Sequence, residues 1–264
     1  MAFEKICING LEILRVSELQ KYGVDAFFTT RRYINSNDFN LGYKWANSKE
    51  EIDKNFRILF KNLEIDYRNI YYAKQVHKND IIVVEKGFDF FEYNQENEAD
   101  GLITQKSGIT LMTFHADCIP VYIFDKEKRI ISLIHSGWRG SLQHISKRAI
   151  DILILQFKSN VSSLVVTIGP GICKEHFEVG KDVYDAFLQE FGNDICIYRE
   201  GKFYLDLKKA IEKDLLGNGL KKEQIIVSDM CTYEKEDLFF SYRRDFKSPE
   251  KLGSMVALMR MVGR

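Results

Sequence analysis

The sequence has little proline, no excess of either charge and no long apolar run. Only three prolines occur in 264 residues, and no repeat, low-complexity segment or flexible linker interrupts the chain. We therefore expect a single domain over residues 1–264. The 38 basic residues balance 38 acidic ones, so the basic excess typical of nucleic-acid-binding proteins is absent. The longest apolar stretches have only the length of strands, which predicts neither a membrane span nor a membrane partner.

Cysteine is also sparse, and its pattern argues against a disulfide framework. The number is odd, the spacing is wide, and no apolar secretion signal opens the sequence. These features favour a reducing compartment, and we expect a cytoplasmic protein. The five cysteines are Cys7, Cys118, Cys173, Cys196 and Cys231.

Apolar and aromatic residues are plentiful, at 45% and 13% of the chain, and they predict a folded protein of mixed α/β class. Asn9-Gly10 between apolar runs predicts a hairpin with a type I′ turn. Ser48 and Glu51 form a capping box that opens a helix through about Leu63. Further helices are expected from near 141, over 181–191 and over 206–217. Strands are expected over 24–30, 70–75, 81–85, 101–104, 110–114, 121–124, 130–135, 164–168, 225–228 and 255–259.

Three potential metal ligands lie at strand ends or interruptions: His77, Cys118 and His135. We expect Pro120 to break a strand beside Cys118, because it lacks an amide donor. Two imidazoles and one thiolate form a common zinc shell that leaves a fourth position open for water or substrate. The spacing alone leaves the alternative open that each is a buried core residue.

The remaining histidines carry weaker signals. If the segment from His115 to Cys118 stays extended, these two side chains point to opposite faces, and only one of them enters the site. His144 follows a helix start and reads as a surface or capping residue. His176 falls in an expected loop.

Several short motifs together resemble one family. The chain is similar to the YfiH family, also called the laccase-domain or multicopper polyphenol oxidase family, which includes purine nucleoside phosphorylases. The resemblance covers nearly the whole chain. The motifs include Gln75-Val76-His77, Ala99-Asp100-Gly101, Ala116-Asp117-Cys118-Ile119-Pro120, His135-Ser136-Gly137-Trp138-Arg139-Gly140, Phe177-Glu178-Val179-Gly180 and Ser241-Tyr242-Arg243-Arg244-Asp245.

The resemblance implies a four-layer α-β-β-α sandwich with mixed sheets, and zinc on His77, Cys118 and His135. It also implies phosphorolysis of adenosine, inosine and S-methyl-5′-thioadenosine, with deamination of adenosine. The sequence departs from the family pattern at His115, where Thr is usual, at Ser136, where Ala is usual, and at Phe177, where Tyr is usual. None of these changes removes a ligand.

The implied chemistry suggests roles for further residues. Zinc lowers the pKa of bound water and acts as a Lewis acid, and Asp117 is expected to orient a ligand or move a proton. Forked guanidinium groups suit phosphate, which makes Arg31, Arg139 and either Arg243 or Arg244 candidates. Arg139 is preferred, because it lies four residues from an expected ligand.

Asn40 and Gln75 are candidates for binding the sugar or the base. The alternatives are turn stabilisation for Asn40 and a polar strand position for Gln75. Cys173 is a second thiol for which we expect a structural role.

Three other functions stay open. A copper-dependent polyphenol oxidase is disfavoured, because five histidines are too few for a blue-copper centre plus a three-copper cluster. A thiol hydrolase would use Cys118 as nucleophile and His135 as base. A peptidoglycan editing role in cell-wall synthesis is the third.

Overall fold

The computed structural model describes residues 3–34, 36, 38–46, 48–92 and 96–262. It opens with the expected hairpin: β1 (Phe3–Ile8) pairs antiparallel with β2 (Leu11–Val16) around Asn9 and Gly10, both at positive φ. The first sheet has the order β1-β2-β3-β15-β7-β4. Its other strands are β3 (Val24–Tyr33), β4 (Ile70–Tyr71), β7 (Thr110–His115) and β15 (Met255–Met261).

The second sheet has the order β14-β10-β8-β9-β6-β5, and it mixes parallel and antiparallel pairs. Almost every residue of its central strands is buried, as expected for a sheet covered on both faces. Its strands are β5 (Ile81–Val83), β6 (Gly101–Thr104), β8 (Ile119–Asp125), β9 (Ile130–Ser136), β10 (Leu164–Ile168) and β14 (Ile225–Val227).

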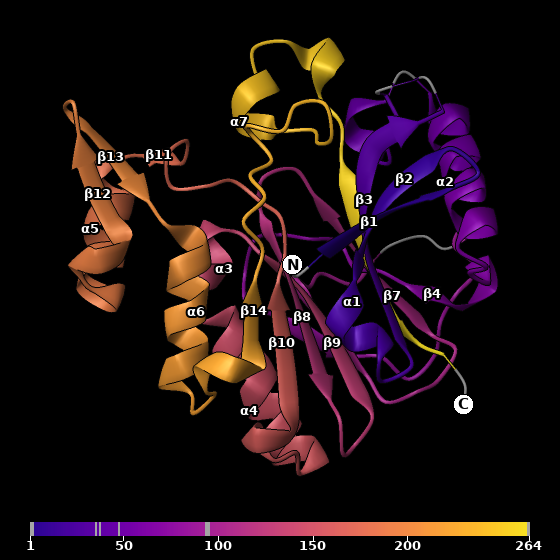
Figure 1. Cartoon of the computed structure of the whole chain (residues 1–264), viewed down its shortest axis with the longest axis horizontal. Helices are drawn as coiled ribbons and strands as arrows, with labels where there is room; N and C mark the ends of the chain where they lie inside the picture. Colours follow the sequence, from indigo (N-terminus) through magenta and orange to yellow (C-terminus); the bar gives the residue numbers. More distant parts are fainter. Residues whose placement is uncertain (1–2, 35, 37, 47, 93–95, 263–264) are drawn as a thin grey trace.

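The two sheets face each other, and helices cover their outer faces (Figure 1). One apolar core, with Phe28 and Tyr122 among its members, lies between the sheets. A second core lies under α2 (Lys49–Asn62) on the first sheet. A third lies between the second sheet and α4 (Ile145–Phe157) and α6 (Leu207–Gly217). The expected α-β-β-α arrangement and mixed class are thereby confirmed.

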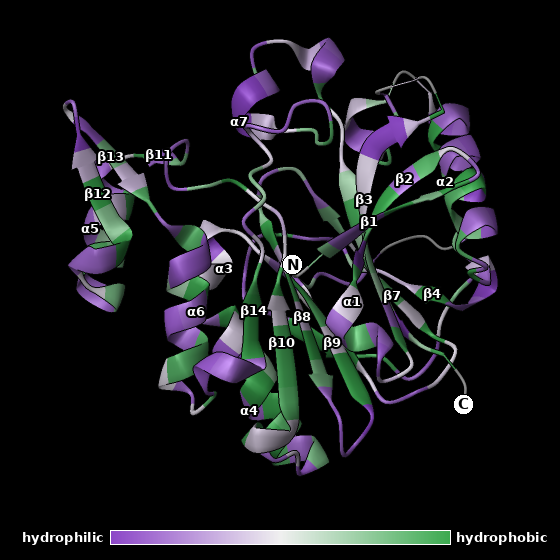
Figure 2. Cartoon of the chain, in the orientation of Figure 1, coloured by the Kyte–Doolittle hydropathy of each residue, from purple (hydrophilic) through white to green (hydrophobic). Residues whose placement is uncertain are grey.

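Apolar residues concentrate on the strands between these layers, while the outer faces of the helices are hydrophilic (Figure 2). The predicted helix starts are confirmed: Ser48 accepts the Glu51 amide at 3.2 Å, which is one half of the expected capping box, and Asp206 accepts the Lys209 amide at 3.0 Å. Three short helices complete the fold: α1 (Ser17–Gln20), α3 (Trp138–Leu142) and α7 (Tyr242–Asp245). In the part of the chain that the structure describes, no helix is long and apolar enough to cross a membrane.

A small third sheet stands apart from the sandwich, and no strand of it was predicted. Its order is β11-β13-β12, from β11 (Glu178–Val179), β12 (Cys196–Arg199) and β13 (Lys202–Leu205). It packs with α5 (Lys181–Phe191) at one side of the molecule (Figure 1). Its hairpin turns at Glu200-Gly201 through two positive φ angles, a weaker sequence signal than Asn-Gly.

Three local predictions were wrong. The strand does not break at Pro120, because β8 runs through it and the Pro120 carbonyl accepts the Gly169 amide; the interruption lies earlier, at Asp117, where φ is +84°. The helix expected from near Ser141 is two helices, separated at His144, where φ is +58°. The strand expected over 70–75 ends at Tyr71.

Candidate functional site

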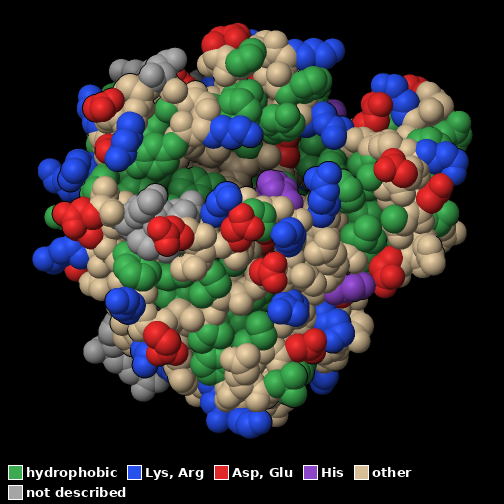
Figure 3. All heavy atoms as spheres, turned by 180° about the vertical axis from the view of Figure 1, so that it is seen from behind, with side chains coloured by type: hydrophobic (Ala, Val, Ile, Leu, Met, Phe, Trp, Pro, Cys, Tyr) green, Lys and Arg blue, Asp and Glu red, His purple; other side chains and the backbone are tan. Residues whose placement is uncertain are grey.

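A cavity of about 660 Å³ opens at one end of the two sheets. On the face in Figure 3 the surface is hollowed, histidine is visible inside the hollow, and Lys and Arg side chains lie around it. Loops supply most of the wall, and strand ends supply the floor. The lining includes Tyr43, Lys44, Trp45, Tyr72, Lys74, Gln75, His77, Phe114, His115, Asp117, Cys118, His135, Trp138, Arg139, Ile172, Phe177, Tyr242, Arg243 and Ser254.

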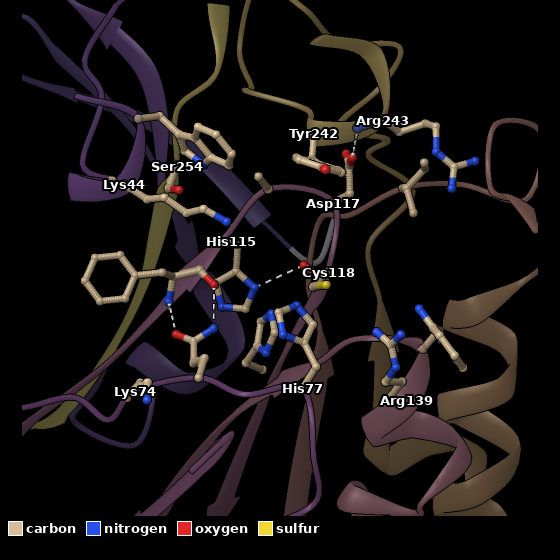
Figure 4. A pocket seen from close by; sticks show the side chains of 18 of the residues that line it. Lys44, Lys74, His77, His115, Asp117, Cys118, Arg139, Tyr242, Arg243 and Ser254 are labelled. Atoms are coloured by element: carbon tan, nitrogen blue, oxygen red, sulfur yellow. Dashed lines mark hydrogen bonds between the residues drawn. The ribbon is translucent and has the colours of Figure 1, made fainter. Parts of the chain in front are cut away.

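The three expected metal ligands meet in this cavity. The ligand atoms of His77, Cys118 and His135 all lie within 4.8 Å of one another. His135 comes from β9, Cys118 from the turn between β7 and β8, and His77 from the loop after β4. His135 is buried, Cys118 is half-buried and His77 is exposed, so the cluster is closed from behind and open towards the cavity (Figure 4).

Two unusual backbone positions aim the ligands. His77 has φ +60°, and Asp117, next to Cys118, has φ +84°. Such angles cost a non-glycine residue about 1–3 kcal/mol and occur often at functional sites. Gly137 passes close by, since a Cβ there would lie 3.0 Å from Cys118 Sγ and 3.1 Å from His77 Cδ2. The backbone therefore passes the cluster at a distance that leaves little room for any side chain larger than that of glycine.

A buried carboxylate behind the cluster fixes two of the ligands, and sequence reasoning gave it no role. Asp100 Oδ1 lies 2.8 Å from His135 Nδ1. Asp100 Oδ2 accepts the amides of Val76 at 3.1 Å and Lys78 at 2.9 Å, on either side of His77. The Ala99-Asp100-Gly101 motif was the one signal that could have revealed it.

The charges of the cluster reinforce one another. Burial opposes the Cys118 thiolate, but the imidazoles of His135 and His77 outweigh it and lower the pKa of Cys118 to about 6. Burial likewise opposes the His135 imidazolium, but the Cys118 thiolate and Asp100 raise the pKa of His135 to about 9. A thiolate at neutral pH is the form that binds metal or attacks an electrophile.

The donor set fits a zinc ion. Because Nδ1 of His135 is held by Asp100, its Nε2 is left to face Cys118 and His77, the arrangement seen when a carboxylate orients a metal-bound histidine. One sulfur and two nitrogen donors are a common zinc shell, and the open cavity side leaves room for a further ligand.

The other three histidines do not join the cluster. His115 is buried against it, with its ring centroid 5.2 Å from that of His135. Both its nitrogens are engaged, Nδ1 with the Cys118 carbonyl at 3.0 Å and Nε2 with Thr113 Oγ1 at 2.8 Å. His144 bonds Asp214 at 2.8 Å, and its side chain makes no cap contact.

Asp117 points away from the three ligands and towards the loop of α7 (Figure 4). Its Oδ1 accepts the Thr232 hydroxyl at 2.6 Å, and its Oδ2 accepts the Arg243 amide at 2.7 Å. Burial raises the pKa of this carboxyl, against those hydrogen bonds. In the structure Asp117 therefore holds the backbone of Arg243 at the cavity wall.

The four candidate arginines separate into two groups. Arg139 and Arg243 line the cavity. Arg139 is exposed and stacks on the ring of Trp138 at 4.2 Å, whereas Arg243 also donates to the Glu178 carbonyl at 2.6 Å. Arg31 lies outside the lining, above the ring of Phe240 at 4.4 Å. Arg244 lies outside it too and bonds Asp245 and three carbonyls.

Asn40 and Gln75 both hold backbone in the structure. Asn40 Oδ1 accepts the amides of Gly42 at 2.8 Å and Ser254 at 2.9 Å, and Asn40 lies outside the lining. Gln75 lines the cavity, but its amide pairs with both the N–H and the carbonyl of Phe114, at 2.6 and 2.8 Å. The Asn40 contacts match the turn alternative. Gln75 lies beyond the end of β4 and in no strand, and its side chain bonds the backbone of β7 instead.

Several lining residues were missed by the sequence reasoning. Lys44 and Lys74 lie across the cavity from Arg139 and Arg243 (Figure 4). Trp45 and Tyr242 come from opposite ends of the chain, and their rings lie 6.3 Å apart. Lys44, Lys74 and Trp45 carry no local signal, because their proximity to the site exists only in the folded chain. Tyr242 lies in one of the family motifs, but sequence reasoning assigned it no role of its own.

Comparison with known proteins agrees with this architecture. The family described as multi-copper polyphenol oxidoreductase laccase matches residues 25–262. A purine nucleoside phosphorylase of Bacteroides thetaiotaomicron is 30% identical, covering 88% of this chain and 91% of the relative. Adenosine deaminase RL5, from an unknown prokaryotic organism, is 28% identical over 84% of this chain and 89% of the relative.

Solved structures match just as broadly. YlmD from Geobacillus stearothermophilus superposes with a TM-score of 0.90 at 27% identity, covering 99% of both chains. The hypothetical protein YfiH of Bacillus licheniformis gives 0.86 at 27% identity, covering 95% of this chain and 96% of the other.

Proposed function

This chain belongs to the multi-copper polyphenol oxidoreductase laccase family, and from that premise we propose that it is a zinc-dependent purine nucleoside phosphorylase. The proposed substrates are adenosine, inosine and S-methyl-5′-thioadenosine, with deamination of adenosine as a second activity. The observation that carries the proposal is the cluster of His77, Cys118 and His135 in a cavity lined by aromatic and cationic side chains. The names of the relatives support it.

Zinc at the cluster would supply a Lewis acid and a polarised water. Residues behind the cluster would hold the metal ligands in the orientation that binding requires. Asp100 accepts the Nδ1–H of His135, which leaves Nε2 as the nitrogen that would bind the ion once its own proton is lost, and the same carboxylate anchors the backbone on both sides of His77. A ligand that is already oriented loses less entropy when it binds.

Phosphate is the second substrate of phosphorolysis, and Arg139 is the residue proposed to bind it. Its guanidinium contacts the face of Trp138 and has no carboxylate partner among the described residues. Planar guanidinium groups bind phosphate through paired N–H donors. Arg243 would help from the neighbouring wall, where Asp117 fixes its backbone; in this account Asp117 is a positioning residue.

The aromatic lining suits a purine base. Trp45 and Tyr242, whose rings lie 6.3 Å apart, line the cavity together with Trp138 and Phe177. Stacking on an aromatic face is worth about 1–3 kcal/mol per nucleobase. The ring faces would orient the base, while the cationic side chains receive the phosphate.

The two purine reactions can be separated by their products. Adenosine is incubated with and without phosphate, on protein whose zinc content is known, and the products are resolved by chromatography. Phosphorolysis yields adenine and ribose 1-phosphate only when phosphate is present. Inosine as the sole product would make deamination the main reaction, and no product from zinc-loaded protein would overturn the proposal.

One observation favours a second candidate, a thiol hydrolase. Cys118, His135 and Asp100 form a thiol-imidazole-carboxylate series in which the imidazole lowers the pKa of the thiol. Such an enzyme has no need for His77 in the same cluster, which favours zinc. Activity that survives a chelator but is lost on alkylation by iodoacetamide would establish the hydrolase.

The copper-dependent polyphenol oxidase suggested by the family's description is less well supported. Only two of the five histidines share the cluster, and both ring nitrogens of His115 are engaged elsewhere. A blue-copper centre and a three-copper cluster would need more imidazoles. A cell-wall editing role finds no supporting contact among the described residues.

A further inference from the structure

A second group of potential ligands lies outside the cluster already described. It is formed by two segments with the same spacing, Cys173-x-x-His176 and Cys231-x-x-Glu234. A parallel bridge between Gly171 and Cys231 brings these segments side by side. Pairs of ligands three residues apart, on two neighbouring turns, are the usual arrangement of structural zinc sites. The proposed reaction uses none of these four side chains.

The donor atoms converge on one carboxylate oxygen. Glu234 Oε1 lies 3.3 Å from His176 Nε2 and 3.5 Å from Cys173 Sγ. The three ligand atoms of Cys173, His176 and Glu234 all lie within 4.8 Å of one another. Cys231 is adjacent, and its sulfur accepts the Cys173 amide at 3.2 Å.

These separations match a tetrahedral zinc shell. Zinc binds nitrogen and oxygen at about 2.0–2.1 Å and sulfur at about 2.3 Å. At a tetrahedral angle those bond lengths place an N–O pair about 3.3 Å apart and an S–O pair about 3.5 Å apart. The observed separations are 3.3 and 3.5 Å.

The imidazole is oriented in advance. The ring of His176 stacks on that of Tyr233, with the centroids 4.1 Å apart and the planes 14° from parallel. This contact keeps Nε2 directed at Glu234, whose own backbone follows Tyr233 in the chain. The ligand geometry therefore comes from packing within the two segments.

We propose that Cys173, His176 and Glu234 bind a second divalent ion of the zinc class, with Cys231 beside Cys173 as a neighbouring thiol. The Cys173 thiolate and the Glu234 carboxylate together carry two negative charges, which one divalent ion neutralises. On binding, the S–H bond of Cys173 breaks, the sulfur electron pair binds the metal, and the proton goes to water. No electron is transferred.

The position of this second site gives it a structural role. Ile172 and Phe177, on either side of the first segment, line the cavity. Thr232, in the second segment, donates to Asp117, which holds the backbone of Arg243. An ion that joins the two segments would stiffen this wall without touching the reacting atoms.

Cobalt(II) is the probe that tests this site, because thiolate binding gives it an intense charge-transfer absorption. The double variant His77→Ala/Cys118→Ser removes the first cluster and leaves the second. We expect this variant still to bind one equivalent of cobalt(II), at the second site, and to show the thiolate charge-transfer band. We expect Cys173→Ser or Glu234→Gln, added to it, to abolish the band, while Cys196→Ser leaves it unchanged.

A second measurement covers the case in which the double variant does not fold. The wild-type chain and its Cys173→Ser variant are dialysed against zinc, and bound metal is counted by mass spectrometry. Loss of one equivalent in Cys173→Ser supports the site. Equal metal content in the two proteins overturns it, as does a cobalt band that survives Cys173→Ser. A Cys173–Cys231 disulfide in protein purified under reducing conditions also overturns it.

Discussion

The Asp100→Asn variant tests the support behind the proposed zinc ligands. Asp100 is fully buried and accepts three hydrogen bonds, from His135 Nδ1 at 2.8 Å, Val76 N at 3.1 Å and Lys78 N at 2.9 Å. An asparagine keeps one acceptor oxygen and has an NH₂ group in place of the other. That NH₂ group must face one of the N–H donors. One side of the contact is therefore lost whichever way the amide turns.

The expected magnitude follows from that loss. A buried donor left unsatisfied costs about 1–3 kcal/mol of stability. Loss of the carboxylate behind a metal-bound histidine weakens metal binding about 10- to 100-fold, or about 1.4–2.8 kcal/mol. We therefore expect the zinc Kd of Asp100→Asn to rise by one to two orders of magnitude. The assay is competition with a chromophoric chelator, alongside urea unfolding.

Asp214→Asn is the matched control. Asp214 is also buried, accepts a hydrogen bond from His144 Nδ1 at 2.8 Å and an amide from Lys147 at 3.1 Å, and lies outside the cavity. It should lose similar stability with an unchanged zinc Kd. The reasoning is refuted if Asp100→Asn keeps the wild-type Kd, or if the control weakens zinc binding equally.

Three further outcomes are expected. Arg139→Ala should raise the KM for phosphate about tenfold or more with zinc content unchanged, whereas Arg148→Ala, exposed on α4, should not; loss of zinc in Arg139→Ala would contradict the phosphate role. Gly137→Ala should lower zinc affinity, because its Cβ meets the Cys118 sulfur at 3.0 Å, whereas Gly217→Ala meets nothing within 4 Å and should not. In protein stripped of metal by a chelator, the rate at which iodoacetamide modifies Cys118 should rise with pH, and the midpoint of this rise should lie near the thiol's pKa of about 6. A midpoint near 8.5, the pKa of a free thiol, would contradict the electrostatic effect of the imidazoles.

The sequence predicted most of the fold because the signals there are local. Asn9-Gly10 at a turn, the Ser48 and Asp206 caps, and Gly192 after α5 each act within a few residues of their position. The misses have a different origin. The chain turns through positive φ at Asp117 and His144, and neither an aspartate nor a histidine is enough to predict that conformation. Tertiary contacts fix both turns: the Asp214 bond to His144 and the Thr232 bond to Asp117.

The candidate site divides in the same way. That His77, Cys118 and His135 lie together was predictable, because metal-binding residue types at strand ends are recognisable and because the motifs resemble a family. Asp100 was missed, since its role depends on contacts across the second sheet and on the loop of His77. Arg31 was chosen for its guanidinium alone, and the fold places it outside the lining.

The most direct test of the central claim is inosine phosphorolysis by zinc-loaded protein, compared with His77→Ala and His144→Ala. His77 belongs to the cluster, whereas His144 bonds Asp214 outside the cavity. We expect hypoxanthine and ribose 1-phosphate from the wild type and from His144→Ala, and loss of both products in His77→Ala. Turnover that persists at the wild-type rate in His77→Ala, or its absence from the zinc-loaded wild type, would contradict the account.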